Sequence, residues 1–150
     1  MISFSKDNNA IIRDIFPHCA IAVENNNYLN TSAYDIITDG NFISDIVYSN
    51  NLFFLLDIAH AKISAINKKI DYQKYLNSLP LDKIIQLHIS QHTVSDKIAF
   101  DSHIELNDET LLELPFYFQL SKHLRYLTVE YYQSARKLID LLSKIKKITL

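Results

Sequence analysis

The hydrophobic pattern of this chain is strongest at residues 52–57, where five apolar residues run without a break and end in Asp57. A continuous apolar run of this length is typical of a strand that is buried on both faces, as in a parallel sheet covered by helices. An ionisable residue that closes such a strand lies where α/β folds place their chemistry, at the carboxyl end. His60 follows three positions after Asp57 and is a second candidate for that chemistry.

Other segments repeat this pattern of an apolar strand with an ionisable residue near its carboxyl end. They are residues 20–23 followed by Glu24, residues 83–89 with His88, residues 126–131 with Glu130, and a shorter extended piece at 98–103 with Asp101 and His103. The rest of residues 93–107 is expected to form a loop, and residues 31–41 are polar and irregular.

Helical spacing of apolar residues predicts the remaining elements. The predicted helices are residues 5–16, residues 42–48, a two-part stretch after His60 that ends with 72–79, a helix from Asn107 or Asp108 toward Pro115 or beyond, and a last helix after Ser134. Helices that alternate with strands indicate parallel βα units. We find no repeat or linker, so we treat residues 1–150 as a single α/β unit.

Composition narrows the possible functions and the cellular location. The net charge of −2 gives no basic surface for nucleic acid or for an anionic membrane. Gly40 is the only glycine, which excludes glycine-rich phosphate loops. The sequence has neither an apolar run of transmembrane length nor a signal-peptide pattern. The single cysteine, Cys19, cannot form an internal disulfide and is expected to be a small packing residue, so we expect a cytoplasmic protein.

Seven residues form the candidate site, namely Glu24, Asp57, His60, His88, Asp101, His103 and Glu130. If the strands are parallel neighbours, these side chains converge on one rim of the sheet. Four carboxylates in one pocket would repel each other, and divalent cations remove that cost. Mixed carboxylate and imidazole ligands suit zinc, manganese or iron, and bridging carboxylates hold two or three metal ions close together. Each residue taken alone also has a structural explanation, for example Asp57 as a helix N-cap. Their recurrence at the ends of several strands favours a metal site.

The order of these residues resembles the ligand order of the xylose-isomerase-like TIM barrels. Five segments narrow the resemblance to one branch, the multinuclear non-haem iron-dependent oxidative enzymes of the methanobactin-biosynthesis type, which modify peptides. The segments are VENNNYL at 23–29, LLDIAHAKISAIN at 55–67, LPLDKIIQLHISQH at 79–92, FDSHIELND at 100–108 and TVEYY at 128–132. The resemblance covers nearly the whole chain from about residue 20.

This resemblance implies an iron site of two or three ions that uses dioxygen to modify a ribosomally made precursor peptide, often at cysteine. A small partner protein would present the peptide. The seven residues would be metal ligands, Asn25 matches a motif asparagine near the site, and His92 would be a further ligand or a residue that supports one. No catalytic residue is assigned. The chain departs from the family pattern at Gln91 and Tyr132, which bears on substrate handling.

The resemblance also implies a fold larger than this chain, because a (β/α)₈ barrel needs about 250 residues. We therefore expect residues 1–150 to be a single partial TIM-barrel domain, the carboxyl-terminal half with about strands 4 to 8, incomplete as a lone chain. An amino-terminal half barrel or self-association would complete it. Two alternatives remain open: a sugar isomerase or hydrolase of the same superfamily that uses manganese or zinc, and a non-catalytic truncated remnant or assembly subunit.

Overall fold

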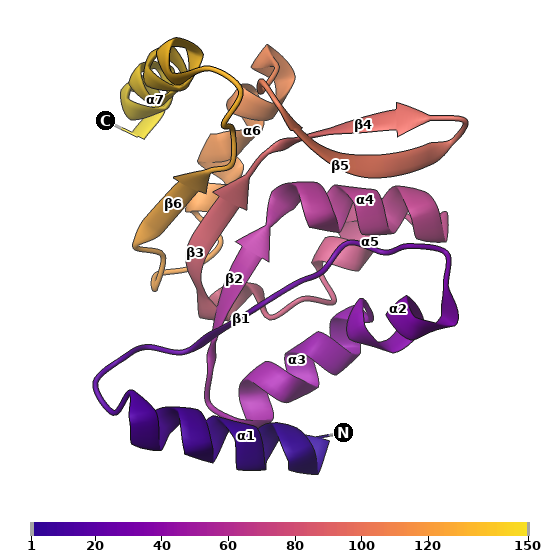
Figure 1. Ribbon diagram of the computed structural model, residues 1–150, viewed down its shortest axis with the longest axis vertical. Coiled ribbons are helices and arrows are strands. Elements are labelled where there is room, and N and C mark those ends of the chain that lie inside the picture. Colours follow the sequence, from indigo (N-terminus) through magenta and orange to yellow (C-terminus); the bar gives the residue numbers. More distant parts are fainter. Residues whose placement is uncertain (1, 150) are drawn as a thin grey trace.

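A parallel sheet of four strands organises the computed structural model, which describes residues 2–149 (Figure 1). The strands lie in the order β1-β2-β3-β6, and their bounds are Ala22–Glu24, Phe53–Asp57, Ile84–Ile89 and Tyr126–Val129. All three pairings are parallel, and Asp57 lies opposite His88 in the register. The α/β class and the parallel βα units predicted from the sequence are therefore confirmed.

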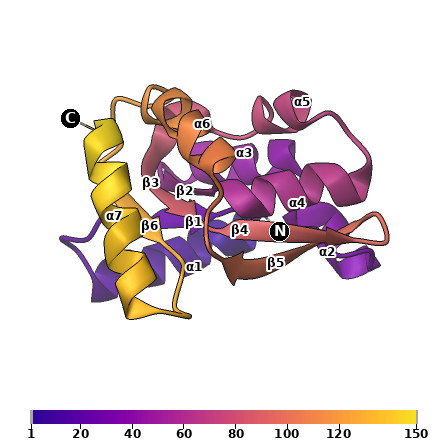
Figure 2. The ribbon, with the colours of Figure 1, turned by 90° about the horizontal axis from the view of Figure 1, so that it is seen from above.

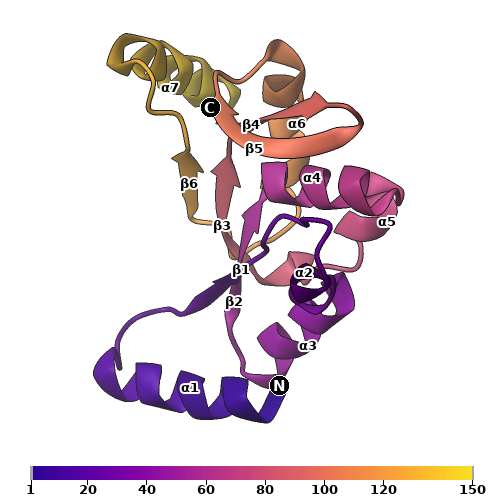
Figure 3. The same cartoon turned by 45° about the vertical axis from the view of Figure 1, so that its right-hand side comes forward.

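The helices bury one face of this sheet. Phe54, Leu56 and Leu87 are fully buried there, and residues of α3, α4, α6 and α7 complete the core. The helices are α1 Ile2–Ile15, α2 Ser32–Ile37, α3 Gly40–Ser49, α4 Ile58–Lys68, α5 Tyr72–Leu76, α6 Asp108–Phe118 and α7 Ala135–Thr149, with a short 3₁₀ turn at Leu81–Lys83. Figure 3 shows α1 beyond the amino ends of the strands and α7 beyond their carboxyl ends.

Side-chain caps fix where several helices begin. Asp39, Asp57, Asp71 and Asn107 each accept a hydrogen bond from the backbone N–H three residues later. The start of the helix predicted from Asn107 or Asp108 is thus confirmed, as is the possible N-cap role of Asp57. Such caps satisfy N–H groups that the first turn of a helix leaves unpaired.

The structure corrects three local predictions. Residues 93–107 were expected to be mostly loop, but Gln91–Ser95 (β4) and Ile98–Ile104 (β5) form an antiparallel hairpin that projects beside α4 (Figure 2). The two turn residues, Asp96 and Lys97, adopt positive φ angles of 51° and 66°. Glycine or asparagine usually occupies such positions, so the sequence carries no turn signal here. The segment 31–41 contains helix α2, and Cys19 is exposed rather than packed. No helix in residues 2–149 is long and apolar enough to cross a membrane.

Candidate metal centre

All seven predicted site residues lie together at the carboxyl ends of the strands. Glu24 ends β1, Asp57 ends β2, His88 lies near the end of β3, and Glu130 directly follows β6. The hairpin brings the remaining acid and histidine over this edge from β5, and His60 comes from the first turn of α4. The parallel arrangement therefore produces the convergence that the sequence pattern predicts.

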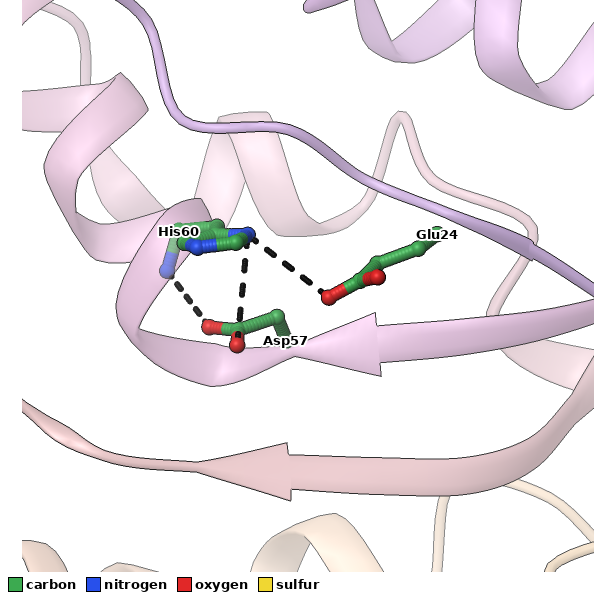
Figure 4. Close-up of side chains that lie close together, drawn as sticks. All are labelled: Glu24, Asp57 and His60. Atoms are coloured by element: carbon green, nitrogen blue, oxygen red, sulfur yellow. Dashed lines mark hydrogen bonds and ion pairs between the residues drawn. The ribbon is translucent and has the colours of Figure 1, made fainter. Parts of the chain in front are cut away.

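Six of these residues form a closed ring in which carboxylates and imidazoles alternate. The closest N···O distances around the ring are Glu24–His60 3.9 Å, His60–Asp101 3.2 Å, Asp101–His103 2.8 Å, His103–Glu130 3.4 Å, Glu130–His88 3.0 Å and His88–Glu24 3.5 Å. The seventh, Asp57, lies inside this set, with Oδ2 3.9 Å from His60 Nδ1 (Figure 4). We call this arrangement the acid–histidine ring.

Asp57 is common to two potential metal-binding groups within the ring. In one group its carboxylate lies with Glu24 and His60, and in the other with His88 and Glu130, and the potential ligand atoms of each group are within 4.8 Å of one another. Its side chain is fully buried. A carboxylate shared in this way is the arrangement that two bridged metal ions require.

Three buried polar atoms in this site make no contact of hydrogen-bonding geometry among residues 2–149, although His88 Nδ1 lies 3.0 Å from Glu130 and His103 Nε2 lies 2.8 Å from Asp101. They are Asp57 Oδ2, His88 Nδ1 and His103 Nε2. A buried polar atom without a partner is costly, and a bound ion is one of the few explanations for it. Three orphaned atoms within one ring of acids and imidazoles, and a donor set of mixed oxygen and nitrogen, fit divalent transition-metal ions.

The pKa values of Asp57 and His60 also favour a bound cation. Burial raises the pKa of the Asp57 carboxyl to about 7, against the opposing effect of His60. Burial lowers the pKa of His60, but the charge of Asp57, the hydrogen bond to Asn25 and the charge of Asp101 outweigh it, so the net shift is upward. The metal-free site therefore holds protons that bound cations would displace.

Asn25 positions two members of the ring at once. Its buried side-chain amide donates to the Asp57 backbone oxygen and accepts from the Asp57 N–H, both at 2.9 Å. Its own backbone oxygen accepts from His60 Nδ1 at 2.9 Å. His60 Nδ1 thus donates to the Asn25 oxygen and is also the ring nitrogen that lies 3.9 Å from Glu24 and from Asp57, whereas Nε2 faces Asp101. Metal-binding histidines are commonly oriented by such a carbonyl.

The structure adds residues that the sequence did not single out. Gln86 contacts His88 Nε2 at 3.0 Å and Thr128 Oγ1 at 2.9 Å, so His88 turns Nδ1 toward the ring. Ser90 donates to Asp101 Oδ1 at 3.3 Å. Gln86 and His88 are two residues apart on one strand, and this period of two is the signal that would have found the amide.

Two details of the hairpin differ from the expectation. Asp101 and His103 do reach the same site, but His103 has a left-handed φ of 46°, a conformation that non-glycine residues adopt mainly at constrained positions. His92, predicted as a ligand or a supporting residue, lies within β4 opposite Asp101. It makes no ion pair with the ring in the described part of the chain; instead its side chain borders a separate pocket with Lys62, and burial and Lys62 lower its pKa.

Comparison with known proteins identifies a family that matches nearly the whole chain. A family model described as "RiPP precursor modification enzyme MbnB/TglH/ChrH" matches residues 3–149, where RiPP denotes a ribosomally synthesised and post-translationally modified peptide.

Curated relatives that match part of the chain are named UPF0276 protein. The UPF0276 protein of Caulobacter vibrioides is 27% identical over 96 residues, which are 64% of this chain and 34% of the relative. The UPF0276 protein of Rhizorhabdus wittichii is 27% identical over 97 residues, with the same two shares of 64% and 34%. The one from Acaryochloris marina is 28% identical over 83 residues, which are 55% of this chain and 30% of that protein. The matched segment thus spans about a third of the length of these relatives.

Proposed function

The chain belongs to the MbnB/TglH/ChrH family of RiPP precursor modification enzymes, and on that premise we propose that it takes part in the metal-dependent oxidative modification of a ribosomally made peptide. The observation that carries this proposal is the acid–histidine ring around Asp57, with its three orphaned buried atoms. Two or three iron ions are the proposed occupants, with Glu24, Asp57, His60, His88, Asp101, His103 and Glu130 as ligands.

The residues of this chain would hold and orient these ions. Asp57 would bridge, because its carboxylate is common to both potential metal groups. Asn25 and Gln86 would orient the imidazole rings of His60 and His88. Bound iron would supply the binding and reduction of dioxygen that oxidation of a peptide thiol or amide requires. The substrate of the proposed reaction is a cysteine-containing precursor peptide, presented by a small partner protein.

We further propose that the sheet is one arc of a larger (β/α)₈ barrel and that residues 1–150 are a single partial barrel domain. Within residues 2–149, β1 and β6 each pair with one neighbour, so both outer edges of the sheet are open. Open parallel edges call for further strands. Another polypeptide segment with the remaining strands, or a second copy of this chain, would supply them. Sedimentation analysis of the purified chain tests this, and a stable, metal-loaded monomer would contradict it.

Metal content tests the proposed function directly. The chain is purified without oxygen, supplied with ferrous iron, and analysed for metal across a size-exclusion peak. We expect two or more irons per chain, and a loss of iron in Asp57→Ala and His88→Ala. His18→Ala is the matched control, because His18 is exposed and lies outside the ring. A folded protein without stoichiometric metal would overturn the proposal.

Dioxygen uptake separates the oxidative enzyme from its main alternative. The donor set of the ring also suits manganese and zinc. We expect the ferrous protein to consume dioxygen and the manganese-loaded or zinc-loaded protein not to do so. Tight binding of manganese or zinc, together with no uptake by the ferrous form, would instead favour an isomerase or hydrolase.

A further inference from the structure

The β4–β5 hairpin has two edges, and the protein pairs only one of them. Asn67 of α4 acts on the β5 edge like a neighbouring strand: its Oδ1 accepts from the Ala99 N–H at 2.7 Å and its Nδ2 donates to the Ala99 oxygen at 3.0 Å. The same Nδ2 donates to the Tyr28 oxygen at 2.9 Å and so ties this edge to the chain after β1. The β5 edge is therefore occupied.

The β4 edge is open. Ala99 turns its N–H and C=O toward Asn67 and away from β4, so its partner Val94 must turn its own N–H and C=O outward on the other side. His92, two residues earlier on β4, has the same orientation. In the described residues, the one hydrogen bond to these outward groups comes from Gln91 Nε2 to the His92 oxygen, at 3.3 Å. The Val94 side chain is 54% exposed.

A pocket lies beside this open edge. It has a volume of about 260 Å³ and is lined by Lys62, Ala65, Ile66, Ile70, Tyr72 and His92. Most of its wall is apolar, and the ammonium group of Lys62 is already paired with Glu113 at 2.6 Å. The pocket is therefore suited to bind an apolar side chain rather than an anion. An apolar cavity of about 150 Å³ is enough to admit benzene, so this volume accommodates one large side chain.

We propose that the β4 edge and this pocket together bind an extended segment of the substrate peptide. The peptide would add to the hairpin as a third strand through the outward groups of His92 and Val94. Alternate side chains of that strand lie on the face that carries His92, and one apolar side chain would fill the pocket. The identity of this peptide as a precursor peptide rests on the proposed function.

The position of the edge relative to the ring supports a substrate rather than an unrelated ligand. His92 lies directly opposite Asp101 across the hairpin, and Asp101 is a member of the ring. β4 begins next to Ser90, whose hydroxyl also contacts Asp101. A peptide that follows the β4 edge toward Gln91 is therefore led to the acid–histidine ring.

Selection from a random dodecapeptide library displayed on phage provides the probe, with the metal-free chain as bait. We expect the selected peptides to share an apolar residue, flanked by residues that alternate between apolar and polar as in a strand. One selected peptide is then synthesised in two forms, each N-methylated at every second residue in one of the two registers. N-methylation should abolish binding in one register only. Successive N–H groups of a strand point to opposite edges, and only the edge that faces β4 would form hydrogen bonds. No selected peptide, or equal effects in the two registers, would overturn strand addition.

Two variants locate the bound peptide. Val94→Pro removes the outward N–H at a strand edge that tolerates proline, and Val94→Thr is its matched control because it keeps the N–H. Ile66→Trp fills the pocket, and Ile36→Trp is its control because Ile36 is exposed on α2. We expect a loss of peptide affinity of about tenfold or more with each test variant, equivalent to about 1.4 kcal/mol, and little change with the controls. Binding that survives both test variants would contradict the proposal.

Metal analysis of the same variants separates this inference from the proposed function. Val94→Pro and Ile66→Trp should keep the iron content of the wild-type chain, which also shows that they fold. Iron bound without any peptide bound would refute the inference alone, whereas peptide bound without iron would refute the proposed function alone. A concentration-dependent dimer that Val94→Pro abolishes would assign the edge to a second copy of this chain and overturn the peptide site.

Discussion

The side chain of Asn25 pairs with the backbone of Asp57 as a neighbouring strand residue would. Both hydrogen bonds are 2.9 Å long and fully buried, so they extend the pairing of β1 and β2 by one step beyond the end of β1. This contact holds the carboxylate of Asp57 at the centre of the acid–histidine ring. The same residue orients His60, so a single amide fixes both a carboxylate and an imidazole.

Asn25→Asp tests this positioning role because the two side chains have the same shape. The variant loses the donor to the Asp57 oxygen and adds a further acid beside the ring. We expect the free energy of unfolding to fall by about 1–3 kcal/mol and metal affinity to fall by about 10- to 100-fold. Urea unfolding and a manganese titration measure the two effects. Asn26→Ala is the control, because Asn26 is exposed and its side chain accepts only from the N–H of Asn27. Unchanged metal affinity in Asn25→Asp would contradict the positioning role.

The sequence was sufficient to predict the sheet and the convergence of the seven site residues. Residues 52–56 are continuously apolar, and in β2 Phe54 and Leu56 are buried while Phe53 and Leu55 are half-buried. Parallel strands bring their carboxyl ends to one edge. These are local patterns with a direct structural consequence, so they can be recognised in a single sequence.

The hairpin and its surroundings could not be predicted in the same way. Its turn uses Asp96 and Lys97 at positive φ, where glycine or asparagine would have given the signal. The register places His92 opposite Asp101 with its side chain at a pocket, and Asn67 pairs with Ala99, 32 residues away. Such contacts depend on how distant elements pack, and no local pattern encodes them.

Gly40 is required by packing, because a Cβ there would overlap Ser78 Oγ and lie 2.8 Å from Ser78 Cβ. Ser78 itself is held in place by the bond that its hydroxyl donates to the Tyr75 oxygen. We expect Gly40→Ala to destabilise the protein by about 1–3 kcal/mol. Ser78→Gly should restore most of this loss when it is combined with Gly40→Ala, whereas Ser78→Ala, which keeps the Cβ, should restore less. Thermal unfolding of the single and double variants measures the coupling, and additive effects would refute the clash.

Tyr72 and Tyr117 share a short hydrogen bond of 2.6 Å between their hydroxyls, and Tyr117 also donates to Glu113 at 3.4 Å. We expect Tyr72→Phe to cost about 1 kcal/mol at neutral pH, because it leaves Tyr117 with the longer bond alone. Tyr126→Phe is the control, since Tyr126 is 60% exposed.

The same tyrosine pair predicts a loss of stability in alkali. Burial raises the pKa of Tyr117 to about 12 and raises that of Tyr72 well above its usual range. In the unfolded chain the two tyrosines ionise near pH 10, while in the folded protein they stay neutral to higher pH. The stability that they contribute is therefore fully present below pH 10 and is lost as the pH rises toward 12. Unfolding followed by tyrosinate absorbance should show this fall, and Tyr72→Phe should reduce it. Equal alkaline profiles for wild type and Tyr72→Phe would contradict the buried pair.

Asp57→Asn separates the stability of the metal-free chain from its capacity to bind metal. An asparagine oxygen can still accept from the His60 N–H and so preserve the N-cap of α4, but it carries no buried charge. Because burial raises the pKa of Asp57 from 3.8 to about 7, the unfolded chain releases this proton before the folded chain does. The stability of the metal-free wild type should therefore fall between about pH 4 and pH 7, by up to about 4 kcal/mol at 1.36 kcal/mol per pKa unit.

In a chelating buffer, Asp57→Asn should match the wild type near pH 4 and exceed it in stability at pH 8. Metal should offset most of this difference, because saturation at 100 times the dissociation constant adds about 2.7 kcal/mol to the wild type and less to the variant. Urea unfolding across this pH range, with and without manganese, measures both effects, and Asp45→Asn on the exposed side of α3 is the control. Parallel pH profiles for wild type and Asp57→Asn would show that the buried charge of Asp57 is already compensated without metal. In that case the strongest electrostatic reason for placing a cation in the ring would be lost.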